Sequence, residues 1–179
     1  KVIVAETLDA LATFYDEHPG FRSRTCWQEL IEGGDDAMFE YTALARIREP
    51  DLVGVCTHKI RQYPPAYGLM SYGRSELAPQ LADYAARIVR HVDWRGPASI
   101  EFKYRAKDGR FYFIETNPRL PWFNGLFRAA GVDLALLMYH DLAGLAEPPS
   151  SQRQRDGVYW VSVAQDIGSY WRRRGTDSW

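Results

Sequence analysis

Two glutamates near the middle of the chain have the spacing of a cation site. Glu101 and Glu115 lie in two strand-like segments that the turn sequence Asp108-Gly109 separates. A three-residue loop over Lys107–Gly109, with Gly109 in the left-handed conformation, makes Glu101 face Glu115. The Cβ atoms of directly facing residues are about 5 Å apart. Two carboxylates at that distance repel, so that one must take up a proton or a cation must lie between them.

Asn117 and Arg119 add to this pair. Asn117 is two residues beyond Glu115 and therefore points to the same face of the strand. Carboxylate and amide oxygens suit Mg²⁺ or Mn²⁺ far better than zinc. The Arg119 guanidinium follows shortly after and could hold a phosphate through a forked hydrogen bond. The segment therefore predicts a metal and phosphate site.

The register of the hairpin is the assumption on which this site rests. In the register above, Phe102 faces Ile114 and Tyr104 faces Tyr112. A two-residue loop would instead put the two glutamates on opposite faces of the sheet. A solvated hairpin face that carries unrelated charges is a further alternative.

The segments around the hairpin predict an α+β fold. Apolar patterns and turn sequences predict strands over residues 2–4, 25–31, 37–47, 52–63, 97–104, 110–116 and 158–161. Helical spacing predicts helices that begin at Thr7 and Ser75, and others over residues 122–130, 133–143 and 164–174. Residues 148–155 are polar and predict a mobile loop. Because the strands come in hairpins and the helices do not alternate strictly with them, an antiparallel sheet is favoured over a doubly wound parallel one.

The composition is that of a folded protein. The chain has 179 residues, of which 46% are hydrophobic and 25% are charged, so disorder is not expected for most of it. The sequence contains no run of about 18 apolar residues, so no membrane span is predicted. The formal net charge of −1 argues against a broad nucleic-acid-binding surface. The two cysteines, Cys26 and Cys56, are expected to be buried and reduced, which fits a cytoplasmic protein.

The carboxylate hairpin resembles the metal-binding end of the ATP-grasp superfamily. The resemblance lies in Glu101-Phe102-Lys103 and in Glu115-Thr116-Asn117-Pro118-Arg119. D-alanine–D-alanine ligase and the carbamoyl-phosphate synthase large subunit belong to this superfamily, and this chain looks like its carboxylate–amine ligase-like members. The resemblance implies a mostly antiparallel sheet flanked by helices. It also implies that Glu101, Glu115 and Asn117 bind the Mg²⁺ ions that bridge ATP phosphates, and that Arg119 contacts the phosphates or an acyl phosphate.

The resemblance continues upstream over residues 27–36. This segment is similar to the linker between the two ATP-grasp lobes, which contacts adenine through its backbone and a glutamate. The residues implied to bind ATP there are Gln28, Glu29, Leu30 and Ile31. In the family, an acidic residue seven positions beyond the glutamate holds the ribose, and Asp36 has that spacing from Glu29. Simple turn chemistry at Asp35-Asp36 is the alternative.

Two basic residues in the next predicted strand are implied to meet the phosphates. Lys59 and Arg61 are two apart, which puts them on one face of that strand. The alternative for both is ordinary exposed charge on an edge strand. His58 points to the other face and is expected to be structural.

The resemblance implies an ATP- and Mg²⁺-dependent ligase. A substrate carboxylate would become an acyl phosphate, which an amine or a thiol would then attack. The implied partners are small-molecule acids and amines, without nucleic acid or membrane, and the aromatic content leaves a homo-oligomer open.

The resemblance also implies how the chain is divided. Residues 1–31 would be the end of the small lobe and the hinge, and residues 32–179 the large lobe with a C-terminal helical tail. Because the chain opens at Lys1 in a strand-like run, the N-terminal part of the fold is expected to be missing, and this chain alone is not expected to catalyse. A non-catalytic nucleotide-binding or interaction module is the alternative, and a metal hydrolase that uses the same carboxylates without ATP is a third hypothesis.

Overall fold

The computed structural model describes residues 2–48, 51–148 and 153–174. The chain divides into two compact units, Lys1–Glu32 and Gly33–Trp179. Their assignment as parts of a small and a large ATP-grasp lobe stays a prediction. Over the described residues, no helix combines the length and the apolar character that a membrane crossing requires.

The first unit is built around one helix. α1 (Leu8–Glu17) begins at Thr7, whose side-chain oxygen accepts a hydrogen bond from the first turn of the helix. The short 3₁₀ helix η1 (Pro19–Phe21) follows it. The predicted strands over residues 2–4 and 25–31 are wrong, because these segments have no sheet partner in the described part of the chain.

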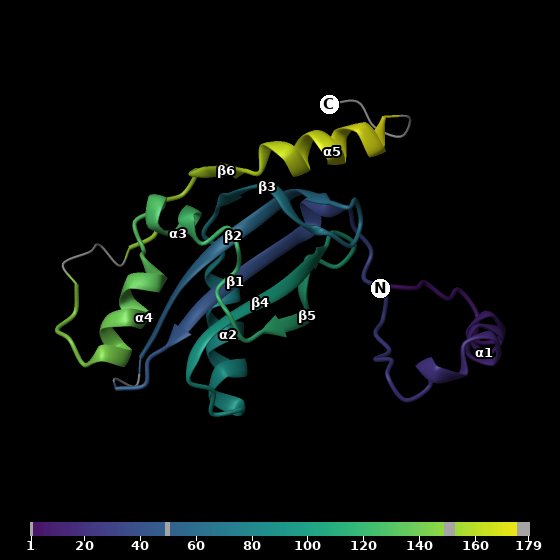
Figure 1. The fold of residues 1–179 in the computed structure, drawn as a ribbon, viewed down its shortest axis with the longest axis horizontal. Coiled ribbons are helices and arrows are strands. Elements are labelled where there is room, and N and C mark those ends of the chain that lie inside the picture. Colours follow the sequence, from purple (N-terminus) through teal and green to yellow (C-terminus); the bar gives the residue numbers. More distant parts are fainter. Residues whose placement is uncertain (1, 49–50, 149–152, 175–179) are drawn as a thin grey trace. The chain divides into compact units, whose positions relative to one another are not determined.

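The second unit contains a six-stranded sheet with the order β5-β4-β1-β2-β3-β6 (Figure 1). The strands are β1 (Met38–Ala45), β2 (Leu52–Tyr63), β3 (Leu69–Ser75), β4 (Gly96–Arg105), β5 (Arg110–Asn117) and β6 (Tyr159–Val161). Every neighbouring pair is antiparallel, which confirms the predicted fold class. β3 is not among the predicted strands, since its small residues Ser71 and Gly73 interrupt any apolar pattern. The helix expected to start at Ser75 is α2 (Pro79–His91), which begins only after β3 ends.

Helices cover both faces of the sheet. α2 packs on one face through a buried cluster made of Ala45, Cys56, Leu81, Ala85, Val89, Ala98, Ile100 and Phe102. α3 (Gly125–Ala129) and α4 (Leu134–Ala143) pack on the opposite face at one end of the sheet. Their cluster consists of Leu44, Val53, Val55, Met70, Phe123, Leu126, Phe127, Val132, Leu134 and Leu137. Along β1 and β2 this second cluster ends next to the buried hydroxyls of Thr42 and Thr57, beyond which the face carries Glu40 and Lys59.

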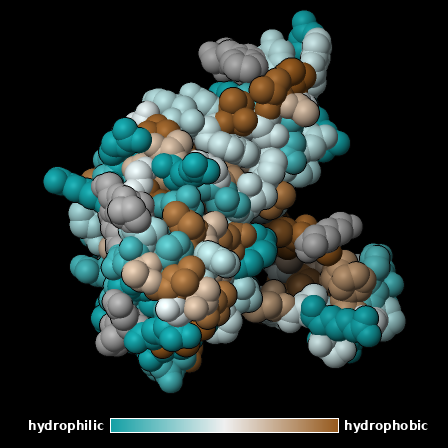
Figure 2. Space-filling view, turned by 60° about the vertical axis from the view of Figure 1, so that its left-hand side comes forward, coloured by the Kyte–Doolittle hydropathy of each residue, from teal (hydrophilic) through white to brown (hydrophobic). Residues whose placement is uncertain are grey.

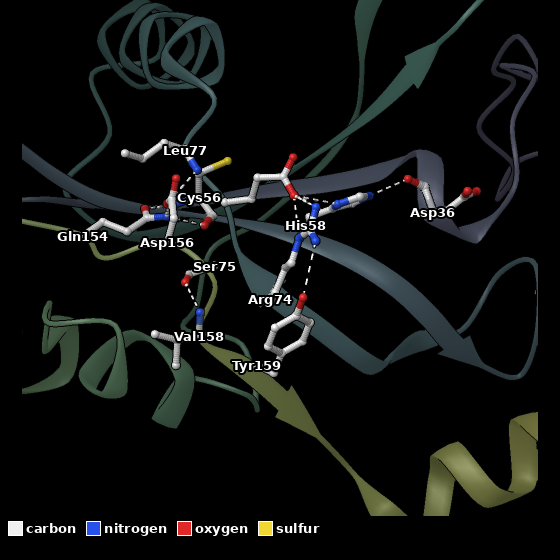
Figure 3. Close-up of polar contacts among 11 residues, drawn as sticks. Asp36, Cys56, His58, Arg74, Ser75, Leu77, Gln154, Asp156, Val158 and Tyr159 are labelled. Atoms are coloured by element: carbon white, nitrogen blue, oxygen red, sulfur yellow. Dashed lines mark hydrogen bonds and ion pairs between the residues drawn. The ribbon is translucent and has the colours of Figure 1, made fainter.

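The segment before β6 is tied to the sheet by side-chain hydrogen bonds (Figure 3). The Gln154 side chain accepts from the backbone N–H of Cys56 at 2.8 Å and donates to the carbonyl of the same residue at 3.0 Å. The Ser75 hydroxyl donates to the Arg155 carbonyl at 2.7 Å and accepts from the Val158 N–H at 3.0 Å. The predicted mobile loop is therefore wrong for Gln154 and Arg155, while residues 149–152 lie outside the described residues.

The last helix has its polar side turned toward the sheet. In α5 (Val163–Arg173), Asp166 and Ser169 are buried. The outward side chains of Val163, Ile167 and Trp171, spaced four residues apart, are 64%, 51% and 58% exposed, and apolar side chains are visible at the top of the view in Figure 2, where α5 lies. This is the reverse of the pattern of an ordinary surface helix, which buries its apolar stripe. α5 is therefore held by polar contacts.

Two leucines on α4 offer a matched test of the second cluster. Leu137 is 2% exposed and Leu142 is 58% exposed. We expect Leu137→Ala to lower the free energy of unfolding by about 2.5–5 kcal/mol, since it leaves a cavity between α4 and the sheet. Leu142→Ala removes the same atoms from water-exposed surface and should change it by less than about 1 kcal/mol. Urea unfolding followed by circular dichroism measures both, and equal losses in the two variants would contradict this packing.

Candidate functional site

Three glutamates stand side by side across the polar part of the sheet. Glu40 of β1 pairs with Glu101 of β4, which pairs in turn with Glu115 of β5. Paired residues in antiparallel strands point to the same face, so the three side chains share the face on which α3 and α4 pack farther along. Glu40 is absent from the predicted site. The signal that could have revealed it is a single acid between Phe39 and Tyr41 in an otherwise apolar strand.

The predicted facing of Glu101 and Glu115 is confirmed, but for a different reason. Gly109 has a φ of 66°, as expected for the left-handed turn position. The ladder nevertheless starts one residue away from the predicted register, so that Phe102 pairs with Phe113 and Tyr104 with Phe111. The predicted pairs of Phe102 with Ile114 and of Tyr104 with Tyr112 are therefore wrong. An irregularity between Glu101 and Phe102 passes over Ile114 and restores the pairing of the two glutamates.

Glu40 is the buried member of the row. Its residue is 5% exposed, and its carboxylate accepts a hydrogen bond from the Thr42 hydroxyl at 2.6 Å. The pKa of Glu40 is raised to about 7, chiefly by burial and further by the nearby Glu101 charge, while the hydrogen bonds from Thr42 and Ser99 and the Lys59 charge oppose this shift. Near neutral pH, Glu40 is therefore divided between its protonated and its ionised form.

Lys59 supplies the positive charge next to this row. It is 6% exposed, and its Nζ donates to Glu101 Oε2 at 3.3 Å and to Gln62 Oε1 at 3.5 Å. β2 lies between β1 and β3, so that the alternative of an exposed edge-strand charge is wrong for this residue. Because this ammonium is already buried, its desolvation cost is met in folding and is not added when an anion binds.

Asn117 and Arg119 extend the site at the open end of β5. The Asn117 amide donates to Glu115 Oε1 at 2.8 Å, and Arg119 is exposed just beyond it. In the described part of the chain, no three His, Cys, Asp or Glu side chains stand close enough together to hold a metal ion. The predicted set is instead two carboxylates and an amide, and these hard oxygen donors fit Mg²⁺ or Mn²⁺. Glu101, Glu115 and Asn117 are the residues that would hold such an ion.

The hydrogen bonds of Arg61 to Asp166 lead to α5 and not to this group. The pairing of β2 with β3 shifts between Lys59 and Arg61, so that a spacing of two no longer guarantees a shared face. The Arg61 guanidinium binds the Asp166 carboxylate of α5 through two hydrogen bonds of 2.8 and 2.6 Å and lies 4.4 Å from the centre of the Tyr72 ring. Its predicted role toward phosphates stays a prediction.

The predicted adenine-binding residues lie in the first unit. Gln28, Glu29, Leu30 and Ile31 belong to an extended segment of that unit, whereas Asp36 belongs to the short 3₁₀ helix η2 (Asp35–Ala37) of the second. The adenine site therefore stays a prediction. Asp36 is exposed, but Asp35 is 7% exposed and accepts hydrogen bonds from the backbone N–H groups of Gln62 at 3.2 Å and Ala66 at 3.1 Å. Asp35 thus fixes local structure.

On the opposite face of β2, His58 makes contacts within the fold. Its ring stacks on Phe39 with 4.2 Å between the centres, and its two nitrogens contact Glu76 at 2.9 Å and the Asp36 carbonyl at 2.6 Å (Figure 3). Both cysteines are free thiols. Cys56 is buried as predicted, and the same prediction is wrong for Cys26, which is exposed.

Solved structures with a similar fold include an ATP complex and an ATPase subunit. Biotin carboxylase of Campylobacter jejuni, in its complex with β,γ-ATP, has a TM-score of 0.59 at 18% identity over 74% of this chain and 30% of its own. The phosphoribosylaminoimidazole carboxylase ATPase subunit of Aquifex aeolicus has a TM-score of 0.56 at 16% identity over 82% of this chain and 51% of its own. Identities this low show the fold alone, which is ATP-grasp as predicted. The chain therefore spans about half or less of these two structures.

Sequence comparison gives the family. Acetyl-CoA carboxylase 1 of Oryza sativa subsp. japonica is 36% identical over 53 residues, which are 30% of this chain and 2% of that protein. The model of the ATP-binding domain of the carbamoyl-phosphate synthase L chain matches residues 40–144, and that range includes Glu40, Lys59, Glu101, Glu115 and Asn117. Since this match covers more than half of the chain, the chain belongs to the family of carbamoyl-phosphate synthase L chain ATP-binding domains.

Proposed function

We propose that this chain holds the phosphates of Mg²⁺-bound ATP for a ligase that activates a carboxylate. The observation that carries the proposal is the facing pair Glu101 and Glu115, with Asn117 on the same face and the buried Lys59 ammonium 3.3 Å from Glu101. Carboxylates and one cation at the polar end of a sheet fit a polyphosphate with its metal ion, whereas a simple apolar ligand would leave these charges unpaired.

The proposed reaction has two steps. A carboxylate oxygen of the substrate attacks the γ-phosphorus, the bond to the bridging oxygen of ADP breaks, and an acyl phosphate forms. An amine, or less often a thiol, then attacks the carbonyl carbon, phosphate leaves, and the nucleophile loses a proton. No protein nucleophile is needed, because positioning and charge stabilisation carry most of phosphoryl transfer.

Each residue of the site has a distinct part in this proposal. Glu101, Glu115 and Asn117 would hold Mg²⁺, which supplies positive charge between the phosphate oxygens when bound. Lys59 and Arg119 orient the phosphates and stabilise the charge that develops on them. Arg61 takes the same part if its pairing with Asp166 opens. Gln28 to Ile31 and Asp36 are proposed to contact adenine and ribose.

Loss of one carboxylate should weaken binding of Mg²⁺ with a non-hydrolysable ATP analogue. We expect Glu115→Gln to raise the dissociation constant about tenfold or more, because it removes a ligand charge and keeps the shape. Glu147→Gln is the matched control, since Glu147 is exposed beyond α4, and it should stay within about twofold of wild type. Isothermal titration calorimetry measures both variants.

Three results would decide between the hypotheses. Equal binding by Glu115→Gln and wild type would reject the carboxylate site. Absence of analogue binding by the wild-type chain would reject the proposed function of this chain. Since this chain alone is not expected to catalyse, the non-catalytic module would be favoured by analogue binding without phosphate release in a longer chain that includes the expected N-terminal part of the fold, screened with carboxylic acids and amines.

The raised pKa of Glu40 predicts a pH dependence of stability. Between about pH 4.5 and 7 the folded chain keeps the Glu40 proton that the unfolded chain has lost, so that this group makes the fold less stable as pH rises. The free energy of unfolding of Glu40→Gln minus that of wild type should therefore be larger at pH 8 than at pH 4, by an amount on the order of 3 kcal/mol. Urea unfolding with a metal chelator at both pH values measures this difference. Parallel pH profiles of the two proteins would contradict the shift.

A further inference from the structure

A row of polar contacts connects the end of α5 with the candidate phosphate site. Arg173 of α5 forms an ion pair with Asp35, and Asp35 Oδ1 accepts from Gln62 Nε2 at 2.6 Å. Gln62 Oε1 then accepts from Lys59 Nζ at 3.5 Å, and Lys59 reaches Glu101 Oε2 at 3.3 Å. The row alternates in charge, and its one neutral member is an amide in the middle.

Gln62 has the chemistry that this middle position requires. Its neighbour on one side is an ammonium, which can only donate, and its neighbour on the other side is a carboxylate, which can only accept. The amide oxygen must therefore face Lys59 and the amide nitrogen must face Asp35. A side chain with two acceptors would repel Asp35, and an apolar side chain would leave both charges without this contact.

Burial makes each contact in the row important. Gln62 is 3% exposed, Lys59 is 6% exposed and Asp35 is 7% exposed. Removing one partner from a buried charged pair leaves the other charge uncompensated, which costs more than the pair contributes. The Lys59 ammonium sits on a flexible four-carbon stem, so that without Gln62 the hydrogen bond to Glu101 is the one that remains among those described for its Nζ.

α5 is held against β2 and β3 by several further contacts. The Ser169 hydroxyl donates to the Gln62 carbonyl at 2.9 Å, and Asp166 binds Arg61 and also accepts from the Ser71 hydroxyl at 3.2 Å. A Cβ atom at Gly168 would lie 2.9 Å from the Tyr63 ring, which indicates a close approach of helix and strand. α5 follows residues 40–144, the range of the family match.

We propose that α5 is a working part of the phosphate site, in which Arg173 and Asp35 orient Gln62 and Gln62 holds Lys59 in the position where it meets the nucleotide phosphates. Gln62, Asp35 and Arg173 are then positioning residues that act through Lys59. The proposal rests on the proposed function for its phosphate ligand, whereas the restraint on Lys59 is a property of the chain itself.

Two measurements on the full chain separate these two aspects. The first is calorimetric titration with Mg²⁺ and a non-hydrolysable ATP analogue. The second is the rate at which acetic anhydride acetylates Lys59, measured by mass spectrometry of its peptide without nucleotide. The variants are Gln62→Met and Arg173→Met, and Ser71→Ala is the matched control because it removes a buried hydrogen bond to α5 and leaves the Gln62 amide intact.

We expect Gln62→Met to weaken analogue binding about tenfold and Arg173→Met about threefold. In both variants, acetic anhydride should acetylate Lys59 faster than in wild type. Ser71→Ala should stay within about twofold of wild type in both measurements. A merely structural role of Gln62 predicts that Ser71→Ala, with a similar loss of thermal stability, has the same effects as Gln62→Met, and that result would overturn the proposal.

Further outcomes are also decisive. If Gln62→Met lacks a folded circular dichroism spectrum, Arg173→Met carries the test, since its side chain is 22% exposed at the helix end. Wild-type acetylation rates in the folded variants would overturn the row of contacts. If wild type binds no analogue but Lys59 is acetylated faster in the variants than in wild type, the proposed function fails while the restraint on Lys59 stands.

Discussion

The candidate site depends on like charges placed opposite one another on neighbouring strands. Glu40, Glu101 and Glu115 are brought together by the pairing of three strands, so their repulsion is built into the sheet. The structure offsets it in two ways: Glu40 keeps a proton more readily than an ordinary glutamate, and Lys59 lies against Glu101. A divalent cation would relieve the same repulsion, which is why this arrangement supports a metal-assisted phosphate site.

Much of the site could be predicted from the sequence, because strand spacing decides which side chains share a face. That rule placed Asn117 on the same face as Glu115, whereas the facing of Glu101 and Glu115 was predicted from a register that the hairpin does not keep along its length. The rule fails where the backbone is irregular: the restored pairing at Glu101 and the shift between Lys59 and Arg61 both depend on bulges, which carry no residue signature in this sequence. Glu40 was missed because its strand partner lies about sixty positions away in the chain, and only the strand order makes them neighbours.

The C-terminal segment shows a second reason for the misses. Its polarity predicted mobility, but Gln154 forms two hydrogen bonds to the backbone of Cys56 and α5 turns Asp166 and Ser169 inward. Polar residues hold a segment as firmly as apolar ones when their partners are buried, and sequence periodicity does not reveal those partners. The site and this segment therefore form one structure, although the family match ends at residue 144.

The late position of these contacts in the chain has a consequence for folding. The hydrogen bond between Val158 and Ser75 closes a loop of 83 residues, and the contacts of Arg61 with Asp166 close one of 105. Loop-closure entropy disfavours such contacts until the intervening chain is already compact. We therefore expect the β1–β2 hairpin to form early and α5 to dock last. During synthesis, the sheet would then fold before α5 leaves the ribosome, and the candidate site would lack its contacts with α5 until that point.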